Sequence, residues 1–315
     1  MNQQGWPWTD AVNPDIYKER TDWPKISIVT PSYNQGQYIE ETILSILNQN
    51  YPNLEYIIID GGSTDNTVEI IKKYEDRLTY WVSEKDNGQA DAINKGLEKC
   101  TGEIFNWINS DDYLERSALY YIRKHWENSI DLLAGNVVNF LGTKRTVFRQ
   151  RNINYEDMLL GIGNAYFHQP GVWFNLTMLR NYLPININYH CCFDGELFLR
   201  LLTTKKAVKY LDQNLVYFRL HLESKTFGTP NNMFREFNII RRIYLIKPQN
   251  KKLKQKFRYY LDKKTFNKII SYLYSKKVSP SSSLKFLLSL ITKSYFQLNR
   301  FYISTLVKSA LGFLK

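Results

Sequence analysis

The chain has 315 residues, of which 43% are hydrophobic and 23% are charged. This composition supplies a sizeable core for one or two domains and excludes a disordered, collagen-like or disulfide-scaffold protein. The net charge of +12 is unevenly distributed, because residues 235–315 hold 19 lysines and arginines against two acids, a net +17. Residues 1–234 hold 23 basic and 28 acidic residues, a net −5. This asymmetry suggests a polyanionic partner for the C-terminal part, either a membrane or a nucleic acid.

Cysteine usage and the N-terminus predict the compartment. Cys100, Cys191 and Cys192 form neither a disulfide framework nor a C-x-x-C metal site. The first residues lack the basic and apolar regions of a signal peptide, and no run reaches the ~18–20 apolar residues of a membrane span. We therefore expect a cytoplasmic protein without a membrane-spanning segment.

Strands and helices are expected to alternate in the first part of the chain. Residues 1–24, rich in Trp, Pro and Asp, predict an irregular N-terminal strap. Apolar runs predict strands at 26–30, 56–59, 78–83 and 103–108, and helical spacing predicts helices at 38–48, 65–74 and 89–100. This order predicts a right-handed, doubly wound α/β domain with a mostly parallel sheet flanked by helices.

The alternation loosens after Asp112. Strands are expected at 131–140, 146–150, 168–174 and 216–220, with a helix at 195–203, and the chain from about residue 234 onward is expected to be helical and basic. The predicted organisation is therefore a strap (1–24), a main domain (25–234) with a first half (25–112) and a second half (113–234), and a helical basic C-terminal region (235–315).

Polar loops follow all four predicted strands of the first half. They are Thr30–Asn34, Asp60–Asp65, Ser83–Asp91 and Asn109–Asp112. In an open α/β sheet, ligands bind beyond the carboxyl ends of the strands. Any one loop is also explained by turn and helix-cap chemistry, but four such loops at one edge predict a ligand site.

Adjacent carboxylates Asp111 and Asp112 at the end of a buried strand predict a cation, because like charges repel unless they are screened. Oxygen ligands favour Mg²⁺ or Mn²⁺, which complete their shells with phosphate and water. An acidic turn before a helix starting near Leu114 is an equally good interpretation of this motif alone. The chain has neither a G-x-x-x-x-G-K-[S/T] loop nor a G-x-G-x-x-G loop, so phosphate would be held mainly through the cation.

These segments resemble glycosyltransferase family 2. The resemblance rests on Thr30–Asn34, Asp60–Asp65, Gly88–Gly96 and Trp107–Asp112, in this order, and spans about residues 25–226. It implies a GT-A fold, a nucleotide-diphosphate-sugar donor, expected to be a UDP-sugar, and inverting chemistry. Within the family, the chain looks most like bacterial enzymes of O-antigen and other surface-polysaccharide assembly. The resemblance assigns donor binding to the first half and acceptor binding to the second half.

The resemblance also assigns roles to individual residues. It implies that the nucleotide-sugar is bound by residues of the first half and by one lysine further along the chain: Thr30, Pro31, Tyr33, Asp60, Asp91, Asp111 and Lys225. It implies that Asp112, Asp111 and His221 hold a divalent metal, Mn²⁺ or Mg²⁺. Two positions depart from the common pattern: Gly61 replaces a second aspartate, and Asn109 replaces the first aspartate of the D-x-D motif. These departures weaken assignment of the base and leave the metal fewer charges.

An inverting transfer also needs a base that takes the proton of the acceptor hydroxyl. Phe193–Leu201 resembles the family's acceptor-side motif, which implies Asp194 as the base and Glu196 as its support or alternative. Without the resemblance, Asp194 is better interpreted as a helix cap. His168–Gly171 is interpreted equally well as an acceptor-side segment or as a packed turn, and Trp107 and Trp173 are expected in the core.

The basic C-terminal region interleaves cations with aromatic residues, as in 251–260. It predicts either docking on the anionic inner face of the cell membrane, near a polyprenyl-linked glycan acceptor, or packing on the main domain. The main prediction is thus a peripheral transferase of surface-polysaccharide synthesis. Gly61 and Asn109 motivate an alternative, a catalytically inactive sugar-nucleotide-binding or scaffold protein. A nucleic-acid-binding protein is less favoured, because no recognition motif is present and the loops are acidic.

Overall fold

The computed structural model describes residues 3–160, 167–221, 224, 230–247 and 252–253. The chain divides into two compact units, residues 1–240 and 241–315, and the sheet lies in the first. Of the predicted helical C-terminal region, the structure describes helix α9 (Pro230–Leu245) and residues 246–247 and 252–253; the rest of that prediction lies outside the described residues. Among the helices described, none combines the length and apolarity needed to cross a membrane.

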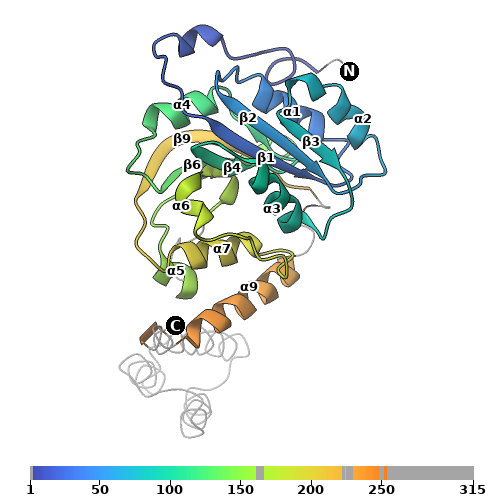
Figure 1. Cartoon of the computed structure of the whole chain (residues 1–315). Helices are drawn as coiled ribbons and strands as arrows, with labels where there is room; N and C mark the ends of the chain where they lie inside the picture. Colours follow the sequence, from blue (N-terminus) through green and yellow to red (C-terminus); the bar gives the residue numbers. More distant parts are fainter. Residues whose placement is uncertain (1–2, 161–166, 222–223, 225–229, 248–251, 254–315) are drawn as a thin grey trace, which may run out of the picture. The chain divides into compact units, whose positions relative to one another are not determined.

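The described strands form one nine-stranded sheet in the order β3-β2-β1-β4-β8-β6-β9-β5, with β7 paired to β6 (Figure 1). Its first four strands are parallel: β3 (Tyr80–Ser83), β2 (Leu54–Asp60), β1 (Ile26–Ser32) and β4 (Ile104–Trp107). The pairing of Ser32 with Asp60 and of Asp60 with Ser83 brings three strand ends level. The polar loops that follow these strands therefore start at one edge, as the sequence predicts.

Helices cover both faces of the parallel strands (Figure 1). Helices α1 (Ile39–Leu47) and α2 (Thr67–Lys72) lie on one side, and α3 (Gln89–Lys99) lies on the other. Strands β1 and β2 are buried on both faces, which explains their continuous apolar runs. Helix α3 approaches β1 closely at Gly96, where an added Cβ would lie 2.5 Å from Cγ1 of Val29. The strap and the first half also contain the 3-10 helices η1 (Pro14–Tyr17) and η2 (Glu75–Arg77).

The second half of the main domain extends the sheet with mixed pairing. The strands here are β5 (Tyr113–Leu114), β6 (Leu132–Leu141), β7 (Lys144–Phe148), β8 (Val172–Asn175) and β9 (Val208–Arg219). The helices are α4 (Ala118–His125), α5 (Tyr155–Leu160), η3 (Gln169–Gly171), α6 (Leu176–Arg180) and α7 (Phe193–Leu201). Strand β8 is antiparallel to β4 and β6, whereas β9 is parallel to β6 and antiparallel to β5.

One prediction for this half is wrong, and two others find a strand but misplace its start. A helix does not start near Leu114, which lies in strand β5; helix α4 begins only at Ala118. The predicted strand 168–174 begins with the buried 3-10 turn η3 and becomes a strand at Val172. The predicted strand 216–220 is the end of the twelve-residue strand β9, whose earlier part is only partly buried and therefore lacks an apolar run.

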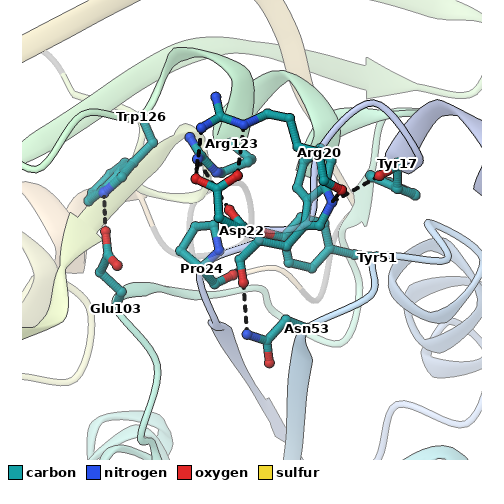
Figure 2. Close-up of polar contacts among 10 residues, drawn as sticks. Tyr17, Arg20, Asp22, Pro24, Tyr51, Asn53, Glu103, Arg123 and Trp126 are labelled. Atoms are coloured by element: carbon teal, nitrogen blue, oxygen red, sulfur yellow. Dashed lines mark hydrogen bonds and ion pairs between the residues drawn. The ribbon is translucent and has the colours of Figure 1, made fainter.

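The N-terminal strap is held on the domain by side-chain to main-chain hydrogen bonds. The indole of Trp6 donates to the main-chain carbonyl of Leu114 at 2.9 Å. The hydroxyl of Tyr17 donates to the main-chain carbonyl of Gln49 at 2.8 Å. Figure 2 shows the adjoining contacts, in which Tyr51 and Asn53 donate to main-chain carbonyls of the strap and Arg123 of α4 reaches Asp22. The strap therefore contacts β5, the loop between α1 and β2, and α4.

Candidate active site

The loops after β1 and β2 are tied together by hydrogen bonds. The amide of Asn34 donates to Oγ of Ser63 at 2.7 Å, and the amide of Thr64 donates to Oδ1 of Asn34 at 2.8 Å. The amide of Gly36 donates to Oδ2 of Asp65 at 2.9 Å. Asn34 adopts a left-handed conformation with φ of 50°, which asparagine tolerates better than most residues. The two loops thus form one rigid rim at the end of the sheet.

Asp60 is the centre of this rim. Its side chain is fully buried and accepts four hydrogen bonds: from the amide and hydroxyl of Ser63, the amide of Gly62 and the hydroxyl of Ser83. The distances are 2.9, 2.5, 3.2 and 2.6 Å in that order. The carboxylate therefore fixes the shape of the β2 loop and links it to β3.

Position 61, where the family commonly has a second aspartate, lies against a side chain from the loop after β3. A Cβ added at Gly61 would lie 2.7 Å from Oδ2 of Asp86, closer than non-bonded atoms approach one another. Asp86 is itself held in place, because its Oδ1 accepts a hydrogen bond from the amide of Gly88 at 2.8 Å. A carboxylate thus lies against position 61 although residue 61 is glycine.

The remaining predicted nucleotide-binding residues, where the structure describes them, differ in exposure and in contacts. Tyr33 is 59% exposed, so its ring is available to a ligand. Thr30 and Pro31 are buried. The Thr30 hydroxyl lies 3.1 Å from the hydroxyl of Tyr56 in β2, so Thr30 helps to hold β1 against β2. Asp91, in the first turn of α3, accepts hydrogen bonds from the amide and the side chain of Asn87. Lys225 lies outside the described residues.

Asp112 is buried beneath the loop after β4. Its Oδ1 accepts from the amide of Arg219 at 3.0 Å, and its Oδ2 accepts from Nδ2 of Asn109 at 3.2 Å. Burial and the adjacent charge of Asp111 raise the pKa of Asp112 well above its usual value. Asn109 in turn accepts from Nε2 of Gln89 at 2.6 Å, which connects this loop to α3.

Strand β9 brings Arg219 and His221 to the two aspartates. Nε2 of His221 lies 2.9 Å from Oδ2 of Asp111, and the His221 ring packs on that of Tyr38 with centroids 4.9 Å apart. Nε of Arg219 donates to the carbonyl of Asp111 at 3.0 Å, and its guanidinium pairs with Glu41. The same guanidinium lies 4.7 Å from the ring centre of Tyr38 and 4.6 Å from that of Phe140. The predicted proximity of His221 to the aspartates is present in the structure.

The donor set at this point fits a hard divalent cation. Among the described residues, no group of three His, Cys, Asp or Glu side chains is arranged as a complete metal site. Asp111 and His221 nevertheless supply an oxygen and a nitrogen atom 2.9 Å apart. Mg²⁺-type sites typically use one or two protein carboxylates and take their other ligands from phosphates and water. The residues present therefore fit a metal held jointly with a diphosphate.

Asp194 and Glu196 lie in the first turn of α7, in different surroundings. Oδ1 of Asp194 accepts from the amide of Gly195 at 2.7 Å, and the residue is half-buried. It is the second residue of the helix, whose N-cap position is Cys192, so it is not the N-cap. Glu196 is 7% exposed and pairs with Arg200 at 2.9 Å. Of the two carboxylates, Asp194 is thus the more accessible.

The segment 168–171 is a packed turn in the structure. Nε2 of His168 is 2.8 Å from Oδ1 of Asn139, and the rings of Phe148 and Phe218 lie against the imidazole. This apolar packing lowers the pKa of His168 to about 4. Trp107 and Trp173 are 1% and 0% exposed, which confirms their predicted place in the core.

Comparison with known proteins identifies the family. The model of glycosyl transferase family 2 matches residues 27–196, more than half of the chain. The chain belongs to glycosyltransferase family 2. The predicted family resemblance is therefore confirmed, and the residues that carry it are those at the strand ends.

Two bacterial relatives are named as glycosyltransferases. The chain is 41% identical over 103 residues to the putative teichuronic acid biosynthesis glycosyltransferase TuaG of Bacillus subtilis, covering 31% of this chain and 41% of TuaG. It is 24% identical over 233 residues to the poly(ribitol-phosphate) beta-N-acetylglucosaminyltransferase TarS of Staphylococcus aureus, covering 69% of this chain and 40% of TarS. The matched regions thus span less than half the length of these two relatives.

Solved structures of family relatives and other transferases share the fold. S. aureus TarS 1–349 in complex with UDP has a TM-score of 0.56 at 20% identity, covering 84% of this chain and 78% of that one. The mannosyltransferase PcManGT of Pyrobaculum calidifontis, in complex with GDP-Man and Mn²⁺, has a TM-score of 0.59 at 16% identity, covering 96% and 87%. These likenesses confirm the predicted GT-A-type α/β fold.

Three residues of the candidate site were not predicted from the sequence. Asp86 fills the space beside Gly61, Gln89 holds Asn109, and Arg219 organises both aspartates. Asp86 and Gln89 lie inside a segment that the sequence analysis selected, so their polar character was a usable signal. Arg219 carried no such signal, because its role depends on pairing between distant strands.

Proposed function

We propose that the protein is an inverting glycosyltransferase that moves a sugar from a nucleotide-diphosphate sugar, a UDP-sugar, to a hydroxyl group of a glycan acceptor. The observation that carries this proposal is the pair formed by Asp111 and His221, 2.9 Å apart beside the buried Asp112 at the end of β4. Family membership and the bracing of the neighbouring loops support it.

The first half binds the donor in this proposal. Tyr33 offers an exposed ring to the nucleoside, and the buried Asp60 fixes the loop after β2. Asp111 and His221 would hold Mn²⁺ or Mg²⁺ together with the diphosphate, while Asp112 and Arg219 keep the Asp111 loop in position. When bound, the metal stabilises the negative charge that develops on the leaving diphosphate. Lys225 and Asp91 complete the proposed set of donor-binding residues.

Asp194 is the proposed general base. Its carboxylate takes the proton of the acceptor hydroxyl while the hydroxyl oxygen bonds to the anomeric carbon and the bond from that carbon to the diphosphate oxygen breaks. The attack comes from the face opposite the diphosphate, so the anomeric configuration is inverted. Glu196 supports the helix through its ion pair with Arg200 and is the less suitable base, because it is buried and already paired.

The proposed setting is the synthesis of a surface polysaccharide, such as O-antigen or capsule, at the inner face of the cell membrane. The relatives TuaG and TarS are named for surface polymers, which supports this setting. The acceptor is a polyprenyl-linked glycan, and residues 235–315, with a net charge of +17, bring the protein to the anionic lipid surface. Binding to anionic liposomes that survives deletion of residues 235–315 would argue against this membrane contact.

Release of nucleotide from a panel of UDP-, GDP- and dTDP-sugars with Mn²⁺ tests the function. We expect turnover with one donor class, a loss of metal-dependent nucleotide binding in Asp111→Ala, and a loss of turnover with retained nucleotide binding in Asp194→Ala. Glu69→Gln, an exposed acid on α2, is the matched control. Nucleotide binding without turnover under all conditions would instead favour the inactive sugar-nucleotide-binding alternative suggested by Gly61 and Asn109.

A further inference from the structure

A carboxylate of helix α9 holds the loop that leads into α7. Oε1 of Glu236 accepts from the amide of His190 at 2.8 Å. Its Oε2 accepts from the amides of Cys191 and Cys192 at 2.7 and 2.6 Å. Three consecutive main-chain N–H groups, just before the proposed base Asp194, are thus satisfied by one side chain 44 to 46 residues away.

Two further residues on the same face of α9 contact the start of α7. Sγ of Cys192 donates to the carbonyl of Met233 at 3.2 Å. A Cβ added at Gly195 would lie only 2.8 Å from Cε2 of Phe237, so the Phe237 ring packs directly on the α7 main chain. Met233, Glu236 and Phe237 have the spacing i, i+3 and i+4, which places them on one helical face. The contact is therefore a continuous surface rather than a single bond.

The physical strength of the contact comes from charge. Amides at and before a helix start lack main-chain acceptors and must find other partners. Hydrogen bonds to a carboxylate are shorter and about twice as strong as neutral ones, and a negative charge at a helix N-terminus also favours the helix dipole. Burial, followed by the charges of Asp194 and Glu236, raises the pKa of the Cys192 thiol.

We propose that Glu236 is a positioning residue for Asp194: it fixes the 190–192 main chain and thereby the first turn of α7, and makes α9 part of the acceptor side of the site. This inference rests on the proposed function of Asp194. It also gives a role to one of only two acids in the otherwise basic region 235–315. Residue 236 lies beyond the predicted end of the main domain at residue 234, but it belongs to the same compact unit as the sheet.

Kinetics of nucleotide release from the active donor test this role in the full chain. Glu236→Ala removes all three hydrogen bonds, whereas Glu236→Gln keeps one acceptor oxygen. Because small displacements of a catalytic group have large effects, we expect turnover to fall about 10-fold in Glu236→Gln and about 100-fold in Glu236→Ala. The dissociation constant of UDP with Mn²⁺ should stay within about twofold, since donor binding is not routed through α7. Equal losses of UDP binding and turnover, or wild-type turnover in Glu236→Ala, would overturn the proposal.

A second measurement separates this inference from the proposed function. Hydrogen exchange of the amides of residues 190–192, followed by mass spectrometry, reports the contact whether or not the protein turns over a donor. We expect faster exchange there in Glu236→Ala, with unchanged exchange in β1 and β2, and no change at either place in Glu69→Gln. Unaltered exchange at 190–192 would refute the positioning contact. Faster exchange with no turnover in the wild type would leave the contact standing and count against the transferase function.

Discussion

The two halves of the main domain build their parts of the site in different ways. In the first half, residues 25–112, the loops after β1 and β2 brace each other, and Asp60 takes hydrogen bonds from its own loop and from β3. In the second half, the 190–192 loop before Asp194 is held by Glu236, a partner 44 to 46 residues away in sequence. The loops after β1 and β2 are therefore specified locally, whereas the 190–192 loop, like the Asp111 loop that Arg219 contacts, depends on the completed fold.

Replacing Asp60 by alanine should break the local arrangement of the first half. Four donors would lose their buried acceptor, at a cost of about 2–4 kcal/mol in the free energy of unfolding. Urea denaturation measures this loss, with Asp76→Ala, an exposed acid between α2 and β3, as the control. A stability equal to the wild type would mean that the rim does not depend on Asp60.

Replacing Arg219 by lysine should weaken the connection between the two halves. A lysine ammonium can pair with Glu41 but cannot also reproduce the planar contacts with Tyr38, Phe140 and the Asp111 carbonyl. We expect about 10-fold lower turnover and weaker Mn²⁺-dependent nucleotide binding, because the Asp111 loop is no longer held. Arg149→Lys, at an exposed position, serves as the control and should behave like the wild type.

His168 should make the stability of the second half sensitive to acid. Its pKa is lowered from 6.5 to about 4 by burial, so above pH 6.5 the ring is neutral in both the folded and the unfolded chain. As the pH falls from 6.5 towards 4, only the unfolded chain binds the proton, and the stability contribution falls by up to about 1.4 kcal/mol per pH unit. His168→Asn should lose this part of the pH slope in urea denaturation. Parallel curves for the two proteins would contradict the assignment.

Removing an exposed ion pair of the strap should have the smallest effect. Arg20 pairs with Asp22 through two hydrogen bonds at 2.9 and 2.7 Å, but both side chains are exposed (Figure 2). Exposed pairs contribute little because water and salt screen them. Arg20→Met should leave the melting temperature unchanged within error, whereas a clear decrease would show that the strap is held by charge.

The same contrast explains what could be predicted from the sequence. The strands and helices of the first half were predicted to within a few residues, because their apolar runs and spacing reflect burial by near neighbours. Strand β9 was predicted only at its end, since its earlier residues are partly exposed and carry polar side chains. Asp111, Asp112 and His221 were found through the family motif, but Arg219 and Glu236 depend on tertiary contacts that no local pattern records.

The close approach of Gly61 and Asp86 means that the two positions cannot vary independently. Any side chain introduced at residue 61 would have to displace the carboxylate of Asp86, and the aspartate common in the family would place two negative charges in contact. The effect of Gly61→Asp therefore depends on which residue stands at 86. A change from this sequence to the commoner loop would therefore require the Asp86 side chain to move or to be replaced.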